Sequence, residues 1–293
     1  MEALDLNNLF GVKDKVVLVT GGSRGIGKMI ATAFALNGAK VYISSRSAKD
    51  CEATANELNA LCQDVNKAGG GQVIPIAADL QKLSEVERLT AEVAKREKYL
   101  HVLVNNAGAT WGATIEEFPD EAFAKVMTLN VQRVFTLTQK CLPLLRAAAA
   151  RGKRGDIWED PARIINIGSV AGLRVPDSEM YSYSASKAAV HHLSRNLAGR
   201  LGWEGITSNS IAPGPFESKM MAHTLRTAGD ALVRGIPLYR IGSPEDIAGT
   251  TLFLASRAGA YVNGATISLD GGRTTRMTGG KWVHSAKRPS AKL

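Results

Sequence analysis

Seven short apolar runs, separated by helical segments, constrain the fold more than any other feature of this sequence. Each run is rich in β-branched residues and almost continuously apolar, which is typical of strands buried on both faces. The runs lie at residues 15–20, 40–45, 72–78, 100–106, 162–169, 206–213 and 264–270. Segments with helical period lie between them, at residues 25–37, 49–65, 82–98, 120–149 and 183–201. This alternation predicts right-handed βαβ units in one doubly wound α/β domain with a seven-stranded parallel sheet.

The charge of the chain is concentrated at its C-terminal end. The net charge is +9, but residues 273–293 hold six basic side chains and no acid, which leaves +3 for residues 1–272. The fold itself therefore lacks the basic excess of a nucleic-acid-binding protein, and we expect no such partner. We expect a basic, weakly ordered tail at 273–293 and a polar surface loop at 150–161.

Other function classes are disfavoured by simple counts. No apolar run approaches the ~20 residues that span a bilayer, so no membrane span is predicted. The three cysteines are scattered without CxxC spacing. We interpret them as reduced thiols of an intracellular protein and predict no metal site.

A glycine-rich turn follows the first predicted strand. Gly21, Gly25 and Gly27 in "TGGSRGIG" lie immediately before a helical segment. Glycines allow the backbone to approach a pyrophosphate closely, and the helix N-terminus then offers free N–H groups. This pattern predicts a Rossmann-type dinucleotide site.

The end of the second strand indicates which dinucleotide is bound. An acid there would bind the ribose hydroxyls of NAD, but the chain has Arg46 in "ISSRSAKD", and Arg24 lies in the glycine turn. Two guanidinium groups suit a 2′-phosphate, with Ser45 and Ser47 as further hydrogen-bond donors. Asp50 lies too far along the chain to replace the missing acid. We therefore expect NADPH/NADP⁺ rather than NADH.

A tyrosine and a lysine are spaced to share one helix face. In "YSYSASK", Tyr183 precedes Lys187 by four residues, whereas Tyr181 precedes it by six and falls off that face. A nearby cation, together with the positive nicotinamide of the oxidised cofactor, would lower the phenol pKa of Tyr183 toward the working range. Tyr183 would then pass a proton to a carbonyl oxygen. Ser169, at the end of the fifth strand, is placed to hydrogen-bond the same oxygen.

Several motifs in the same order resemble the short-chain dehydrogenase/reductase family. They are "TGGSRGIG", "NNAG" (105–108), "LNV" (129–131), "GS" (168–169), "YSASK" (183–187), "APG" (212–214) and "LDGG" (269–272), and the resemblance covers about residues 11 to 272. The segments "DPARIINIGSVAG" and "AGAYVNGATISLDGG" are similar to 3-oxoacyl reductases of the rhamnolipid-pathway type. One departure is His101, where the family often has an acid.

The resemblance implies a set of site residues. Tyr183 would be the acid/base, Lys187 would lower its pKa and bind the nicotinamide ribose, Ser169 would orient the substrate, and Asn130 would hold a water of a proton relay. Pro213 and Gly214 would flank the nicotinamide, and Asp79 and Leu80 the adenine. The implied cofactor contacts are Gly21, Ser23, Arg24, Gly25, Ile26, Gly27, Ser45, Arg46, Ser47, Asp79, Leu80, Asn106, Ala107, Gly108, Tyr183, Lys187, Pro213 and Gly214. Residues 1–272 would form the catalytic domain, with a substrate lid at about 214–240.

The expected activity is NADPH-dependent reduction of a ketone to a secondary alcohol, with a 3-oxoacyl thioester as one substrate class. One alternative is a polyketide-type or other cyclic ketone of secondary metabolism. A peroxisomal 2,4-dienoyl-CoA reductase is disfavoured because such enzymes usually lack the tyrosine. An alternative of another class is a non-catalytic NADP(H) sensor, which would tend to lose Tyr183 or Lys187.

Two further expectations concern assembly and destination. By resemblance, the helices at 120–149 and 183–201 would pair subunits into a homodimer or homotetramer. The chain ends in Ala-Lys-Leu, a variant of the Ser-Lys-Leu peroxisomal address. We expect a peroxisomal import receptor as a partner, with the cytoplasm as the second location.

Overall fold

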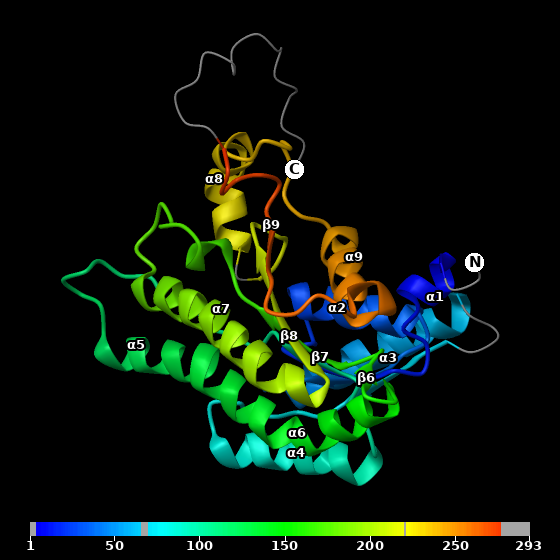
Figure 1. Ribbon diagram of the computed structural model, residues 1–293. Coiled ribbons are helices and arrows are strands. Elements are labelled where there is room, and N and C mark those ends of the chain that lie inside the picture. The colour runs from blue at the N-terminus through cyan, green and yellow to red at the C-terminus, as the bar shows by residue number, and fades with distance from the viewer. Residues whose placement is uncertain (1–3, 66–69, 220, 277–293) are drawn as a thin grey trace.

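All seven predicted strands pair in parallel into one sheet (Figure 1). The computed structural model describes residues 4–65, 70–219 and 221–276. The strands are β1 (Val16–Thr20), β2 (Lys40–Ser44), β3 (Gln72–Pro75), β4 (Val102–Asn105), β7 (Ala162–Ile167), β8 (Ile206–Pro213) and β9 (Thr266–Leu269). Their order is β3-β2-β1-β4-β7-β8-β9, so the direction of winding reverses between β1 and β4. We call the side of the sheet formed by the carboxyl ends of the strands the carboxyl edge. A crevice for a ligand is expected there, at the reversal between β1 and β4.

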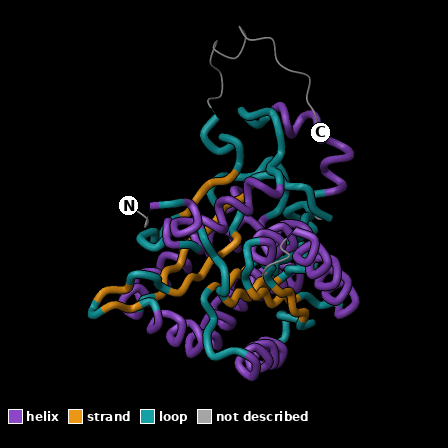
Figure 2. Tube along the Cα trace, turned by 90° about the vertical axis from the view of Figure 1, so that its right-hand side faces the viewer, coloured by secondary structure: helices purple, strands orange, loops and turns teal. Residues whose placement is uncertain are grey.

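Helices cover both faces of the sheet, as Figures 1 and 2 show. One face carries α2 (Gly25–Leu36), α3 (Ala48–Val65) and α9 (Pro244–Ala255), and the other carries α4 (Leu83–Arg96), α6 (Arg133–Arg151) and α7 (Tyr181–Leu201). Side chains of β1 alternate between the two cores: Val17 and Val19 join the first, and Val16 and Leu18 join the second. Because both faces are buried, the strand is apolar at successive positions, which explains the continuous apolar runs.

The predicted long helix at 120–149 is interrupted. The chain forms α5 (Asp120–Met127), one π-helical turn η2 (Thr128–Gln132) and then α6. A π-turn inserts a residue into the helix and is often found at functional sites. Here it carries Asn130, which is buried.

The expected polar surface loop at 150–161 contains regular structure. The segment lies at the surface but forms a short antiparallel hairpin of β5 (Lys153–Arg154) and β6 (Ile157–Trp158). Gly155 adopts a positive φ at its turn, and Trp158 packs against Gly205, where a Cβ would overlap its ring. Strands of two residues are too short to show an alternating pattern, so the sequence gives no period-2 signal.

The described chain continues past the expected domain boundary at 272. Residues 273–276 are held by hydrogen bonds, including one from the amide of Thr274 to the carboxylate of Asp270. The remainder of the expected tail, with its Ala-Lys-Leu ending, lies outside the described residues. Other elements are α1 (Leu6–Phe10), α8 (Ala222–Arg234) in the expected lid, and the 3-10 turns η3 (Val170–Gly172), η4 (Gly202–Glu204) and η5 (Arg257–Gly259). Within the described ranges, no helix is long and apolar enough to cross a membrane.

Candidate active site

The glycine-rich turn forms an open cradle at the N-terminus of α2. Gly21 and Gly25 have positive φ angles of 65° and 51°, which favour glycine. A Cβ on Gly27 would overlap the carbonyl oxygen of Gly21. No side chain caps α2, because its N-cap residue Arg24 makes no capping hydrogen bond. The first amides of the helix therefore remain available to an anionic group.

Thr20 joins this turn to the "NNAG" segment across the switch point. Its hydroxyl donates to the carbonyl of Val104 (3.2 Å) and accepts from the amides of Asn106 (3.0 Å) and Ala107 (3.1 Å). The Asn106 side chain donates to the carbonyls of Thr20 and Gly21, at 2.8 and 3.2 Å. The backbones of two strand ends are thus fixed against each other at the crevice.

The end of β2 is suited to a phosphate. Arg24 and Arg46 are both exposed, and neither pairs with an acid in the described part of the chain. The hydroxyl of Ser23 donates to the hydroxyl of Ser45 (3.0 Å), so the glycine turn and the end of β2 are adjacent. Ser47 lies one residue after Arg46 and accepts from the amide of Asp50 (3.1 Å). An open cradle, two unpaired guanidinium groups and no acid together fit a dinucleotide with a 2′-phosphate.

Ser169, Tyr183 and Lys187 come together at the carboxyl edge. Ser169 follows β7, and its hydroxyl oxygen accepts from the amide of Ala171 (3.1 Å), which leaves its O–H free to donate. The Lys187 ammonium lies 5.6 Å from the centre of the Tyr183 ring and donates to the carbonyl of Ile167 (2.8 Å). Tyr181 points elsewhere: its hydroxyl donates to Glu179 (3.0 Å), and its ring packs edge-on against Phe118.

Burial shifts the pKa values of Lys187 and Tyr183 in the directions that favour their neutral forms. It lowers the pKa of Lys187 to about 8. It also raises the pKa of the Tyr183 phenol, and interaction with the side chain of Ser169 opposes that rise. The predicted lowering of the Tyr183 pKa is therefore not produced by these side chains alone.

Asn130 links the site to the "NNAG" segment. Its side chain accepts from the amide of Ala109 and donates to the carbonyl of the same residue, both at 2.9 Å. It also donates to the hydroxyl of Ser186 (2.9 Å), which in turn donates to the carbonyl of Tyr183 (2.7 Å). Gly108 lies beside both Asn130 and Lys187, since a Cβ on it would be 3.2 Å from Asn130 Oδ1 and 3.6 Å from Lys187 Nζ.

The other expected cofactor residues also lie along the carboxyl edge. Pro213 ends β8 opposite Leu269 of β9, and the amide of Gly214 donates to the carbonyl of Leu269 (2.9 Å). Asp79 and Leu80 follow β3; Asp79 accepts from the amide of Gln81 (3.2 Å), and Leu80 is buried. Ile26 is half-buried in the first turn of α2.

Sequence reasoning missed several residues that shape the site. Thr20 and Ser186 form the connections described above. Ser218 of the expected lid lies against the glycine turn, since a Cβ on Gly25 would be 3.2 Å from the Cβ of Ser218. His191 is buried beside Ser169, and its Nε2 lies 3.1 Å from the Ser169 carbonyl oxygen. A hydroxyl next to a glycine run was the available signal for Thr20; the others depend on tertiary packing.

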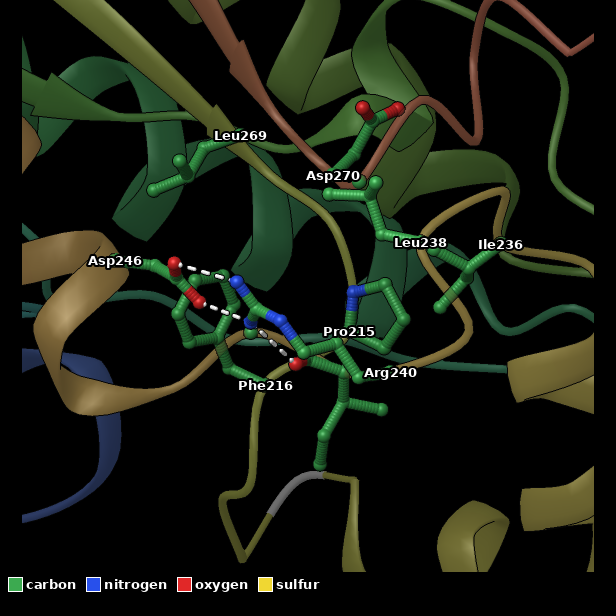
Figure 3. Close-up of a pocket in the computed structure, with 11 residues that line it drawn as sticks. Pro215, Phe216, Ile236, Leu238, Arg240, Asp246, Leu269 and Asp270 are labelled. Atoms are coloured by element: carbon green, nitrogen blue, oxygen red, sulfur yellow. Dashed lines mark hydrogen bonds and ion pairs between the residues drawn. The ribbon is translucent and has the colours of Figure 1, made fainter. Parts of the chain in front are cut away.

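A cavity of about 90 Å³ lies under the expected lid (Figure 3). Pro215 and Phe216 line it after the "PG" turn, and Leu269 and Asp270 line it from the end of β9. In Figure 3, Arg240 forms two hydrogen bonds with the Asp246 carboxylate, at 2.5 and 2.9 Å. Ser169, Tyr183 and Lys187 do not line this cavity, so it belongs to the base of the lid segment rather than to the reacting groups. Among the described residues, no group of three His, Cys, Asp or Glu side chains could hold a metal ion.

Comparison with known proteins agrees with this geometry. A family model described as short chain dehydrogenase matches residues 15–228. A Pseudomonas aeruginosa protein named rhamnolipids biosynthesis 3-oxoacyl-[acyl-carrier-protein] reductase is 44% identical over 90% of this chain and 97% of its own length. A 3alpha-hydroxysteroid dehydrogenase of Mediterraneibacter gnavus is 32% identical over 89% of this chain and 97% of its own.

The fold is also similar to a solved structure. The structure titled Pseudomonas aeruginosa RhlG/NADP active-site complex has 43% sequence identity and a TM-score of 0.82, and the match covers 91% of this chain and 98% of that one. The matched family model spans the glycine turn, the tyrosine–lysine pair and the strands that join them. The chain therefore belongs to the short-chain dehydrogenase family of oxidoreductases.

Proposed function

We propose that this oxidoreductase uses NADPH to reduce the ketone of a 3-oxoacyl thioester to a secondary alcohol. The observation that carries the proposal is the convergence of Ser169, Tyr183 and Lys187 beside an open phosphate cradle at the switch point. The names of two relatives support the substrate and the cofactor: one is called a 3-oxoacyl-[acyl-carrier-protein] reductase, and the solved structure is titled an NADP complex.

The side chains divide the reaction between them. The O–H groups of Ser169 and Tyr183 bind the carbonyl oxygen and fix its position. The reduced nicotinamide, when bound, supplies the hydride to the carbonyl carbon. Tyr183 gives its proton to the oxygen as negative charge develops there. Lys187 stabilises the resulting phenolate, and its N–H groups that do not face Ile167 are available to the cofactor ribose. Asn130 and Ser186 fix the backbone of Tyr183, and Asn130 holds the relay water that returns the proton.

The remaining assigned residues bind the cofactor. The amides of Ser23, Gly25 and Ile26 would bind the pyrophosphate, and Arg24, Ser45, Arg46 and Ser47 would bind the 2′-phosphate. Asp79 and Leu80 would flank the adenine, and Asn106, Ala107 and Gly108, with Pro213 and Gly214, would contact the ribose and nicotinamide. Segment 214–240 acts as the substrate lid.

The test is an NADPH-oxidation screen. Purified protein is assayed with 3-oxoacyl thioesters of several chain lengths beside a panel of cyclic ketones. We expect turnover of the thioesters, at a rate that depends on the length of the acyl chain. No turnover of any thioester, with turnover of a cyclic ketone, would move the assignment to the second candidate. That candidate is favoured by one relative, the hydroxysteroid dehydrogenase, whose name implies a cyclic substrate.

Assembly and destination are part of the proposal. Pairing through α6 and α7 would give a homodimer or homotetramer, which light scattering on the purified protein would measure. Peroxisomal import rests on the terminal Ala-Lys-Leu. It is tested by comparing the location of a fluorescent fusion that ends in residues 277–293 with one that lacks the last three.

A further inference from the structure

Three arginines gather between the loop that precedes α7 and the segment that follows β9. We call Arg174, Arg273 and Arg276 the arginine cluster. The guanidinium groups of Arg174 and Arg273 lie 3.0 and 3.5 Å from the same carboxylate oxygen of Asp177. Arg276 donates to the carbonyl of Gly235 at the end of α8 (3.5 Å). The cluster therefore joins the expected lid to the loop that precedes α7.

The position of the cluster follows from the connections of the site. Arg174 and Asp177 lie on the loop between Ser169 and Tyr183. Arg273 and Arg276 follow β9, where Gly271 and Gly272 turn the chain with positive φ angles of 61° and 85°. The loop between Ser169 and Tyr183 also contacts the segment after "NNAG", because the amide of Ala113 donates to the carbonyl of Glu179 (3.3 Å). The cluster is thus carried by the loop that connects Ser169 to Tyr183 and by the segment that follows β9.

The charges of the cluster are not balanced within the described residues. Asp177 is the one acid that pairs with Arg174 or Arg273. Its side chain is 72% exposed, whereas those of Arg174 and Arg273 are 24% and 20% exposed. Asp270, close by in sequence, uses its two oxygens to accept from the amides of Gly272 and Thr274. Burial first, and then the neighbouring charge of Arg174, lowers the pKa of Arg273.

The surface beside the cluster is apolar. Leu173 and Val175 flank Arg174 in the chain and are exposed to 45% and 87%. Arginine binds phosphate oxygens through paired, charge-assisted hydrogen bonds, while exposed apolar side chains favour contact with a flexible aliphatic chain. A ligand with both properties carries a phosphate at the end of a long, weakly polar arm.

We propose that the arginine cluster binds the phosphate of the pantetheine arm that carries a thioester substrate. The inference rests on the proposed function, because it assigns the carrier end of the substrate whose ketone meets Tyr183. Arg174 and Arg273 bind the phosphate oxygens, and Asp177 holds the two guanidinium groups together when the phosphate is absent. The same phosphate occurs in coenzyme A and in a carrier protein, so either carrier presents the chemistry that the cluster recognises.

The experiment compares charged and uncharged thioesters of one acyl group. The substrates are a 3-oxoacyl-coenzyme A, the 3-oxoacyl thioester of phosphopantetheine and the 3-oxoacyl thioester of N-acetylcysteamine, which has no phosphate. The variant is the double substitution Arg174→Gln and Arg273→Gln. The control is Arg151→Gln, which removes one positive charge from the end of α6, where the guanidinium stacks on Tyr99.

The double variant should raise the KM for the phosphate-bearing thioesters about tenfold, because two charge-assisted hydrogen bonds are lost. The KM of the N-acetylcysteamine thioester, the kcat and the Kd of NADPH should change less than about twofold, since none of them uses the cluster. Asp177→Asn should lower the KM of the charged thioesters. A loss for both charged substrates assigns the contact to their shared phosphate and supports the proposal, whereas a loss for coenzyme A alone assigns it to the nucleotide phosphates and contradicts the pantetheine assignment.

Two further results would overturn the inference. One is an equal change for charged and uncharged thioesters; the other is no change for any of them. If the wild-type protein reduces no thioester, calorimetry of coenzyme A with NADP⁺-saturated protein decides the question. Binding that weakens in the double variant supports the site, and absence of binding to wild type rejects it. Neither calorimetric result bears on ketone reduction, which the cyclic ketone panel tests separately.

Discussion

Charged side chains are buried at both ends of the parallel strands: at the carboxyl edge and at the opposite, amino ends, which we call the amino edge. The two edges neutralise these charges differently. At the amino edge, Lys15 donates to one oxygen of Asp160 (2.8 Å) and Arg163 donates to the other (3.0 Å). Arg163 is 1% exposed and also donates to the carbonyls of Leu254 and Ser256, at the end of α9. Burial acts to raise the pKa of Asp160, but the two cations outweigh it and hold that pKa below its usual value.

At the carboxyl edge, the buried cation has no acidic partner among the described residues. Lys187 is 6% exposed, donates only to a backbone carbonyl, and has its pKa lowered to about 8 by burial. The exposed Arg24 and Arg46 are likewise without ion pairs in the described ranges. Burying a charge without a counter-charge, as at Lys187, destabilises the fold. Unpaired cations of this kind are expected where a ligand supplies the missing partner.

This difference separates residues that hold the fold from residues that act on ligands. Substitutions at the amino edge should lower stability and leave the kinetics of the folded molecules unchanged. Substitutions at the carboxyl edge should do the reverse. Each prediction below tests one side of that separation.

The largest effect is expected for Tyr183→Phe. Loss of the phenol O–H removes the proton donor, so kcat should fall about a thousandfold. The Kd of NADPH and the melting temperature should change little, because the ring and Lys187 remain. The measurement is steady-state NADPH oxidation with a ketone substrate, beside fluorescence titration of the cofactor.

Tyr181→Phe is the matched control. Tyr181 is 40% exposed and its hydroxyl contacts only Glu179 among the described residues, so its loss should change kcat less than about twofold. Unchanged turnover in Tyr183→Phe would reject the reductase mechanism. If the protein nevertheless kept a biological activity that depends on NADP(H) binding, the non-catalytic sensor would be favoured.

The amino edge should respond in the opposite way to Arg163→Met. Removing one member of a buried ion network should lower the free energy of unfolding by about 3 kcal/mol. For a domain of this size that corresponds to a melting temperature about 10 °C lower. The kcat of the folded protein should stay within about twofold of wild type.

A second variant sharpens this result. Lys15→Met leaves the pair of Asp160 and Arg163 intact and should cost about 1 kcal/mol, as for a single partly exposed ion pair. Equal losses in the two variants would show that burial of Arg163 adds nothing. A large loss of kcat in Arg163→Met at full stability would break the separation of the two edges.

The features that sequence predicted are those encoded locally. The seven strands, five helical segments and the glycine turn each occupy one short stretch, and their apolar period reports burial directly. Tyr183 and Lys187 are one helical turn apart, so their proximity follows from helix geometry. The order of the strands was not predicted, because the right-handedness of the βαβ units limits the possible orders without selecting one.

The features that were missed depend on contacts between distant stretches. Thr20 meets Asn106 across 86 positions, and Arg163 meets Leu254 across 91. Neither pair has a local pattern, because which side chains meet depends on strand order and packing. Helix α9 is a different case: Ser243 and Asp246 form a capping box around Pro244, a local signal that the sequence analysis did not use.

A smaller effect is expected for Arg46→Gln at the carboxyl edge. Loss of the guanidinium that we propose binds the 2′-phosphate should weaken NADPH binding by about 2 kcal/mol, or roughly thirtyfold, which is typical of a hydrogen bond to a charged group. The Kd of NADH should not change, because NADH has no 2′-phosphate. Lys49→Gln, an exposed basic residue three positions along, is the control. Equal weakening of NADPH in both variants would indicate general electrostatic attraction instead.

The smallest effect is expected for the pH dependence of stability. It tests His101, a titrating group at the amino edge that is not part of the ion network of Asp160. His101 stands where the family often has an acid, and its Nδ1 accepts from the amide of Val16 (2.9 Å). Burial lowers the pKa of His101 to about 4, below its ordinary value near 6.5. Between those pH values the unfolded chain binds the proton and the folded chain does not, so stability is full above about pH 6.5 and falls as the pH drops toward 4.

His101→Asn should reduce that slope, because an asparagine oxygen can accept from Val16 without titrating. From pH 7 to 5 the wild-type protein should lose about 1 kcal/mol more than the variant, with allowance for partial exposure of the ring. Urea denaturation at a series of pH values measures the difference. His191 also has a pKa lowered by burial, so some slope should remain in the variant. An unchanged slope would place the acid sensitivity at His191 and the carboxyl edge, and the separation between a structural edge and a functional edge would then not extend to pH.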